Sequence, residues 1–287
     1  MSSPRPGHVV CVYAPKGGVG KSAIAVNLAV ALRRRTGQPV TLIDMAQPCG
    51  ALELYLDLSP PRTICDVLAL GGELDEDVLG QAIAPHASGV GLIAGPRPDG
   101  ADGLACLSAK PLLQALTREP GWVVIDLGTQ LDAAHVSALT ASDLVVVPFT
   151  PQLASVGNMP RVRAFLAGLG VPAERLVPVF NQPEYGGAPL SPGLLDRLTG
   201  ATRRLALPDA GHALAWSLDE GRPFVDIQPE SPLGRAFTAL AHRVLVELGQ
   251  ADQAEVAPPV GVLRRVQGLI GRAMTAPRLG GDTHVRA

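Results

Sequence analysis

A short glycine-rich loop constrains this chain more than any other feature. Residues 14–22 read APKGGVGKS and follow an apolar run at 8–13 that is typical of a buried strand. Residues 23–35 then have the apolar spacing of a helix. Strand, glycine loop and helix in this order favour phosphate binding, because backbone N–H groups point at the anion and the helix start carries partial positive charge. The sequence therefore predicts a nucleotide-binding α/β protein.

The side chains of this loop indicate how a nucleotide would be held. Lys21 would reach the terminal phosphates, and the Ser22 hydroxyl would help to hold Mg²⁺. The cofactors predicted from this pattern are ATP and Mg²⁺. The residues expected to contact the nucleotide run from the loop into the helix: Lys16, Gly17, Gly18, Val19, Gly20, Lys21, Ser22 and Ala23.

The loop departs from the common phosphate-loop pattern at its start. Position 15 is proline where glycine is usual, and Lys16 adds a second lysine to a chain that has three lysines in all. This arrangement resembles the deviant Walker A motif of the MinD/ParA superfamily of dimerising ATPases. The resemblance implies an ATP-dependent homodimer in which Lys16 crosses the interface and touches the nucleotide of the other subunit. On that basis Lys16 is a predicted catalytic residue.

A second landmark is the apolar stretch that ends at Asp126. Residues 121–128 read GWVVIDLG, as expected for a central parallel strand that delivers a carboxylate to Mg²⁺. The stretch matches the Walker B strand of the family. Asp126 is therefore predicted both as a catalytic residue and, with Ser22, as a metal ligand. Gly128 and Thr129 would begin switch II.

The strand expected at residues 39–44 ends in Asp44, which should face the same sheet edge as the glycine loop. In the family this strand leads into switch I, commonly D-x-D, whose second carboxylate positions the attacking water. Here that position is Ala46, which has no group to orient water. We expect ATP binding with weak hydrolysis and Asp44 as a catalytic residue. Full compensation by a neighbour such as Gln47 stays open.

Two further positions are predicted to contact the base. Asn181 closes the strand at 175–180, and its amide would read adenine because it can donate and accept together; a simple turn asparagine is the alternative. Pro208 lies in a loop similar to the family's L-P-x-D segment. The runs at 50–68 and 150–158 resemble the CpaE/TadZ branch of Flp/Tad pilus assembly, and we expect no N-terminal receiver-like domain.

Composition limits which other classes of protein this chain can belong to. Hydrophobic residues make up 47% of the 287 positions, yet no apolar stretch approaches the ~20 residues of a membrane-spanning helix. A net charge of −2 makes DNA an unlikely partner for the whole molecule. The four cysteines are scattered without a C-x-x-C pair, which indicates buried thiols in a reducing compartment. We expect a cytoplasmic protein, peripheral at most to the inner membrane or cell pole.

The predicted fold is a doubly wound P-loop NTPase domain with a mainly parallel sheet of seven or eight strands, over residues 1–249. A linker is expected at 250–259, an amphipathic helix at 260–275 and a disordered tail at 276–287. The segment that begins at Val260 and ends at Met274 has basic residues and no acidic ones. It therefore suits a membrane surface or a partner groove, and a helix folded back onto its own domain is the alternative.

These features together predict a dimerising ATP-binding protein that positions or regulates an envelope assembly, with a Flp/Tad-type pilus machine as the first candidate. Pilus, secretion or division machinery would be its partner. A cycling partition or division-site ATPase of ParA/MinD type is one alternative. A scaffold that binds ATP without hydrolysing it is another.

Overall fold

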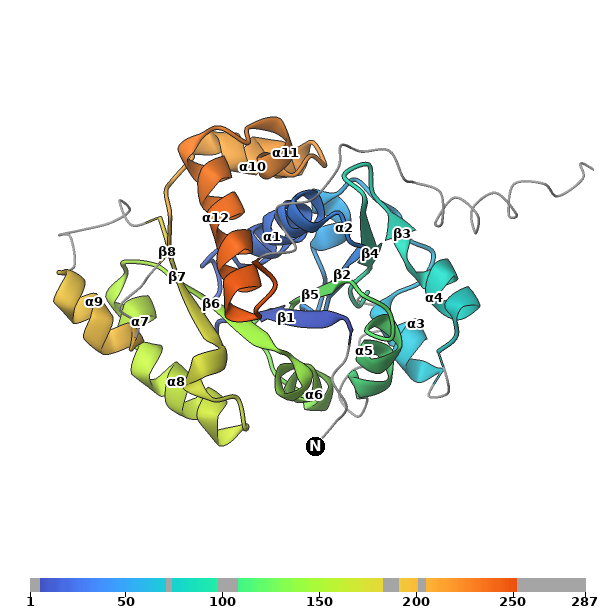
Figure 1. Cartoon of the computed structure of the whole chain (residues 1–287), viewed down its shortest axis with the longest axis horizontal. Helices are drawn as coiled ribbons and strands as arrows, with labels where there is room; N and C mark the ends of the chain where they lie inside the picture. The colour runs from blue at the N-terminus through green and yellow to red at the C-terminus, as the bar shows by residue number, and fades with distance from the viewer. Residues whose placement is uncertain (1–5, 71–73, 98–107, 183–190, 201–204, 252–287) are drawn as a thin grey trace, which may run out of the picture. The chain divides into compact units, whose positions relative to one another are not determined.

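The computed structural model describes residues 6–70, 74–97, 108–182, 191–200 and 205–251. One eight-stranded sheet organises them, in the order β3-β4-β2-β5-β1-β6-β7-β8 (Figure 1). Every neighbouring pair is parallel except β3 and β4. The strands are β1 (His8–Val12), β2 (Val40–Asp44), β3 (Ala84–Pro85), β4 (Val90–Ile93), β5 (Trp122–Asp126), β6 (Leu144–Phe149), β7 (Leu176–Asn181) and β8 (Leu205–Leu207). The predicted doubly wound, mainly parallel sheet is thereby confirmed.

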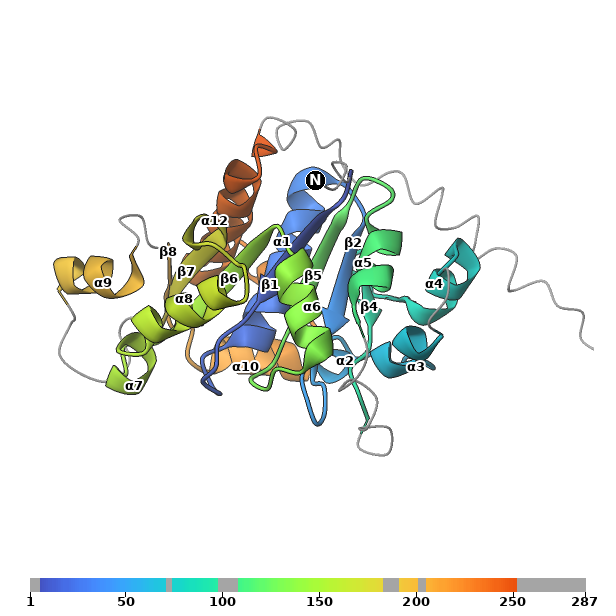
Figure 2. The same ribbon diagram turned by 90° about the horizontal axis from the view of Figure 1, so that it is seen from below.

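Helices cover both faces of this sheet. Helices α1, α10, α11 and α12 lie on one face, and α5, α6 and α8 lie on the other (Figures 1 and 2). Their bounds are α1 (Lys21–Thr36), α2 (Leu52–Tyr55), α3 (Ile64–Ala69), α4 (Glu76–Ala82), α5 (Lys110–Leu116), α6 (Ala133–Ala141), α7 (Leu153–Val156), α8 (Met159–Gly168), α9 (Pro192–Thr199), α10 (His212–Asp219), α11 (Phe224–Ile227) and α12 (Pro232–Glu247).

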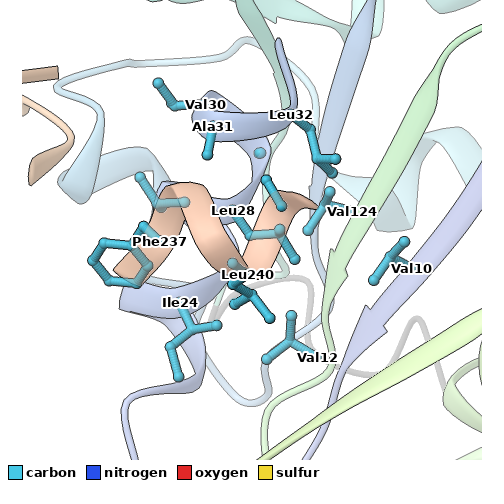
Figure 3. Packing of buried hydrophobic residues seen from close by; sticks show 14 of the residues in the cluster. Val10, Val12, Ile24, Leu28, Val30, Ala31, Leu32, Val124, Phe237 and Leu240 are labelled. Carbon is cyan, nitrogen blue, oxygen red and sulfur yellow. The ribbon is translucent and has the colours of Figure 1, made fainter. Parts of the chain in front are cut away.

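The central strands are apolar without interruption because both of their faces are covered. All five residues of β5 and all six of β6 are buried, as expected for parallel strands between two helical layers. On one face, Ile24 and Leu28 of α1 pack with Phe237 and Leu240 of α12 over β1 (Figure 3). The start of α1 is thereby held firmly above the sheet.

Strand order brings the chemical landmarks together. Strand β5 lies between β2 and β1, with Asp44 and Val12 both in register with Asp126. The glycine loop leaves β1 directly after Val12, so the loop and the two carboxylates meet at the carboxyl edge of the sheet. Such an edge is where ligands bind in open α/β sheets.

Some expectations need correction. The short antiparallel strand β3 and helix α4 were not predicted; two residues are too few to show a period. Cys11 is buried, Cys65 is partly buried and Cys49 is exposed, so the expectation of buried thiols is wrong for Cys49 and incomplete for Cys65, while Cys106 lies outside the described residues. None of the described helices is long and apolar enough to cross a bilayer. The predicted amphipathic helix at 260–275 and the tail at 276–287 lie outside the described residues.

Candidate nucleotide-binding site

The glycine loop presents the start of α1 without a side-chain cap. Gly18 and Gly20 have φ values of 72° and 87°, which non-glycine residues rarely adopt. Gly20 is the N-cap residue, and the first helical bond runs from Ile24 N–H to its carbonyl at 2.9 Å. A Cβ on Gly20 would lie 2.5 Å from Asn181 Nδ2. The first N–H groups of α1 therefore have no helical acceptor, as an anion site requires.

Lys21 carries its charge into the base of this loop. The residue is only 7% exposed, and its Nζ donates to the Lys16 carbonyl at 3.1 Å. Burial lowers the pKa of Lys21, and the nearby Asp126 carboxylate opposes that shift. A buried ammonium group held mainly by a backbone carbonyl is stabilised strongly by an anion. This geometry suits a phosphate ligand.

Asp126 has the coordination that a cation would complete. It is fully buried, and its Oδ1 accepts from the Gly128 N–H at 3.3 Å. Its Oδ2 has no hydrogen-bond partner. Burial raises the pKa of Asp126, while Ser22, Gly128 and Lys21 oppose the shift. An unpartnered buried carboxylate oxygen is costly, and Mg²⁺ prefers oxygen ligands.

The fit to Mg²⁺ is therefore good for the two predicted ligands, Ser22 and Asp126. The described residues contain no group of three or more His, Cys, Asp or Glu able to hold a metal by themselves. A cation at this place would need phosphate oxygens and water to fill its coordination, which is the usual manner for Mg²⁺ in nucleotide sites.

Asp44 has a different environment, although it ends the neighbouring strand. Its Oδ1 accepts from the Ala46 N–H at 2.9 Å, and its Oδ2 accepts from the N–H groups of Ala51 and Leu52 at 2.9 and 3.0 Å. Burial and the Asp126 charge raise the pKa of Asp44 to about 7, although these three hydrogen bonds oppose the shift. Both oxygens thus hold the backbone of the loop after β2, and its predicted catalytic role stays a prediction.

Ala46 lies where the loop after β2 meets the loop after β5. Gly128 packs against it so closely that a Cβ on Gly128 would lie 2.9 Å from the Ala46 Cα. The side chain at this position is a methyl group. The structure therefore supplies no carboxylate at position 46, and the neighbouring Gln47 donates its amide N–H to Asp132 at 2.8 Å.

Lys16 points away from the base of the loop. Its Nζ donates to the Gln152 side-chain carbonyl, in the segment between β6 and α7. This contact is exposed and lies at the same sheet edge as the loop. Within one chain, Lys16 is therefore held by a neutral partner.

A pocket beside the loop receives the two residues predicted to contact the base. Asn181 donates to the Val19 carbonyl at 3.1 Å, and Pro208 follows β8. The pocket is lined by Gly18, Gly20, Ala23, Ile24, Asn181, Gln182, Pro208, Ala210, Leu214, Leu233 and Phe237. A mainly apolar pocket with two side-chain amides, next to a phosphate loop, suits a nucleobase. The structure thus brings together predicted residues from the loop, β7 and β8.

Several site residues were not identified from the sequence. Leu233 and Phe237 have the four-residue spacing of an apolar helix face, so nothing in the pattern separates pocket from core. Asp132 and His135 form a capping box at the start of α6. Their D-x-x-H spacing before an apolar run was a readable helix-start signal, but not one that indicates contact with the loop after β2.

The comparisons with known proteins agree with this geometry. The model of the CobQ/CobB/MinD/ParA nucleotide binding domain family matches residues 10–182. That match spans more than half of the chain and both predicted nucleotide motifs. The chain belongs to this family.

Similar proteins include an uncharacterized ATP-binding protein of Methanocaldococcus jannaschii, 25% identical over 269 residues that cover 92% of this chain and 97% of the relative. The septum site-determining protein MinD of Synechocystis is 25% identical over 83% of this chain and 89% of its own length. A solved ParA family ATPase from Chlorobium tepidum has a TM-score of 0.71 at 20% identity, over 82% of this chain and 98% of that one. The last shows the fold alone.

Proposed function

We propose that this chain is an ATP-dependent dimerising protein that positions or regulates an envelope assembly, with Flp/Tad-type pilus assembly as the first candidate. The observation that carries the proposal is the loop at 14–22, which combines an open anion site with a second lysine at its outer end. ATP and Mg²⁺ are its cofactors. Lys21 and the loop amides hold the phosphates, and Ser22 and Asp126 hold the cation.

Lys16 is the residue that makes dimerisation part of the proposal. In one chain its ammonium group is exposed and bound to a neutral amide, a contact that holds a charge less strongly than a carboxylate would. A triphosphate offered by a second copy is a better partner. The ATP-bound state is then a dimer in which each Lys16 leaves Gln152 and reaches the other nucleotide.

Slow hydrolysis is the second part of the proposal. Ala46 offers a methyl group beside Gly128, and Asp44 uses both oxygens on backbone N–H groups. Neither side chain is placed to orient a water molecule. Phosphoryl transfer depends on such positioning, so bound ATP lasts long and the dimer is long-lived.

The test is light scattering of the full chain with and without ATP and Mg²⁺. We expect a monomer without nucleotide, a dimer with ATP, and no dimer for Lys16→Ala. Lys110→Ala is the matched control, since Lys110 lies in the first turn of α5 and is exposed. A dimer that forms equally without nucleotide contradicts the proposal.

A second candidate function is a cycling ATPase of ParA/MinD type that acts in partition or at the division site. The similarity to a septum site-determining protein favours it. Turnover separates the two candidates. Robust hydrolysis that liposomes or DNA stimulate supports the cycling ATPase, whereas turnover no faster than that of Asp126→Ala supports a stable dimer or a non-hydrolysing scaffold.

Location and membrane contact are proposals as well. The segment at 260–274 would place the protein at the cytoplasmic face of the inner membrane. Co-sedimentation with anionic liposomes should fall when the residues after 257 are removed. Equal sedimentation of both forms supports a helix that folds back onto its own domain.

A further inference from the structure

The loop after β2 is fastened to the start of α6 by side chains that the proposed nucleotide site does not use. His135 is fully buried, and its Nε2 lies 2.7 Å from the Met45 carbonyl oxygen. Its Nδ1 lies 2.7 Å from Asp132 Oδ1. The other oxygen of Asp132 accepts from the Gln47 amide at 2.8 Å. His135 and Asp132 thus hold two residues of the loop, Met45 and Gln47.

The partners of His135 determine the charge of its ring. A backbone carbonyl can only accept, and so can an ionised carboxylate, so a ring that donates from both nitrogens would satisfy these two contacts at once. The Asp132 N–H also faces Nδ1, but at 3.4 Å it is much farther away than the carboxylate. Burial acts to raise the pKa of Asp132, yet the hydrogen bonds from His135 and Gln47 hold it below its usual range. The two side chains form a close contact in which His135 is fully buried and Asp132 is partly exposed.

The helix fixes the carboxylate in place. Asp132 is the N-cap residue of α6, and its Oδ1 also accepts from the N–H groups of Ala134 and His135 at 2.9 and 3.2 Å. Negative charge is favourable at a helix start. Both side chains therefore belong to the first turn of α6, and a displacement of that turn would displace them as well.

Two further contacts join the loop after β2 to the end of β5 and the residues that follow it. The Met45 N–H donates to the Asp126 carbonyl at 2.8 Å. Gly128, with φ of 63°, packs directly against Ala46. The loop after β2 is therefore clamped between the end of β5 and the start of α6.

We propose that Asp132 and His135 are positioning residues, a partly buried ion pair that fixes residues 45–47 against the segment after β5 so that the two segments change conformation together. Asp126, the predicted Mg²⁺ ligand, ends β5. A cation bound there would therefore affect the conformation of both segments. Only this last link, from the ion pair to ATP, rests on the proposed function.

The charge of the ring is tested by nitrogen NMR of the full chain without nucleotide, at pH 7. We expect Nδ1 and Nε2 of His135 both to carry protons, with the signals assigned by their loss in His135→Gln. A neutral ring with a single protonated nitrogen would overturn the ion pair. This measurement involves no ATP, so it is independent of the proposed function.

The clamp itself is tested by hydrogen exchange of the nucleotide-free chain. In His135→Gln, amides of residues 45–52 should exchange at least ~10-fold faster, while those of β6 keep their rates, because only local opening becomes easier. Gln47→Leu removes one contact and should give a smaller effect of the same kind. His86→Gln is the matched control, since the hydrogen-bond partners of His86, Ser88 and the Gly221 carbonyl, lie outside residues 45–52. Unchanged exchange at 45–52, or equal acceleration in β6, contradicts the clamp.

The link to ATP is tested with a fluorescent ATP analogue and Mg²⁺. We expect dissociation about 10-fold faster from His135→Gln than from the His86→Gln control, within the range of ordinary coupling between sites. If the unaltered chain binds no analogue, the proposed function fails while the ring and exchange results stand. If both variants release the analogue at the same rate, the link between the ion pair and ATP is wrong.

Discussion

Asp44 and Asp126 end neighbouring strands in register, and both are completely buried, yet their surroundings differ. Asp44 uses both oxygens to hold three backbone N–H groups of its own loop. Asp126 leaves Oδ2 without a partner, beside a buried lysine and an uncapped helix. The carboxylate at the end of β2 is satisfied within the protein, whereas the carboxylate at the end of β5 keeps one oxygen without a hydrogen-bond partner. Two aspartates with the same burial therefore differ in what they can offer to a bound cation, since only Asp126 has an oxygen that accepts no hydrogen bond.

The largest effect should come from removing Asp44. Asp44→Ala leaves three backbone N–H groups without their acceptor, that of Leu52 fully buried, and we expect a loss of about 3 kcal/mol in the free energy of unfolding. Asp126→Ala should cost less, because it leaves one backbone N–H, that of Gly128, without its acceptor, and Oδ2 has no partner to lose. Urea denaturation of both variants without nucleotide measures the difference. Equal losses would break the comparison.

The next effect concerns the ligand. Lys21→Ala removes the buried charge at the base of the loop, and we expect ATP affinity to fall at least ~100-fold, or about 2.7 kcal/mol. Calorimetric titration with ATP and Mg²⁺ gives the affinity. Lys110→Ala is the control on the surface. A loss of less than ~10-fold would show that Lys21 does not face the phosphates.

The dependence of folding stability on pH should reflect the carboxyl groups of both Asp44 and Asp126. The pKa of Asp44 is about 7 in the folded protein, above its value of about 4 in an unfolded chain, and the pKa of Asp126 is raised as well. The folded state therefore binds more protons in this window, and stability without nucleotide falls as pH rises from about 4 to about 7. Asp126→Asn removes a like charge near Asp44 and should make the fall shallower. Denaturation at several pH values checks this, and a stability that rises through the window contradicts it.

A smaller effect is expected in the base pocket. Asn181→Ala removes the one amide that was predicted to read adenine, and we expect affinity for ATP to fall roughly 5- to 10-fold, about one lost hydrogen bond. Affinity for GTP should change less. The ratio of the two affinities is the measurement. An unchanged ratio would assign Asn181 to the loop alone, through its bond to Val19.

Fold and loop were predictable because each depends on local pattern. The strand before residue 14, the helix after Lys21 and the apolar stretch ending at Asp126 carry period and glycine signals that need no distant partner. Strand order was not readable in the same way. The register that sets Asp44 beside Asp126 results from packing of the whole sheet.

Side-chain partners were the part that the sequence could not supply. A run such as D-M-A-Q gives no sign that the carboxylate of Asp44 turns back to its own loop, or that the amide of Gln47 reaches Asp132, 85 positions away. Contacts of this kind depend on where two loops end in space. The absent carboxylate at position 46 was visible from the sequence, whereas the clamp around it was not.

The unpartnered Oδ2 of Asp126 bears on how fast the protein is degraded in the cell. A ligand that binds only the folded chain adds about 2.7 kcal/mol of stability at a hundred times its dissociation constant. Copies that carry nucleotide should then open to proteases far less often than empty ones. We therefore expect the abundance of this protein to follow the concentration of ATP in the cell. Copies without nucleotide should be degraded sooner than copies with it.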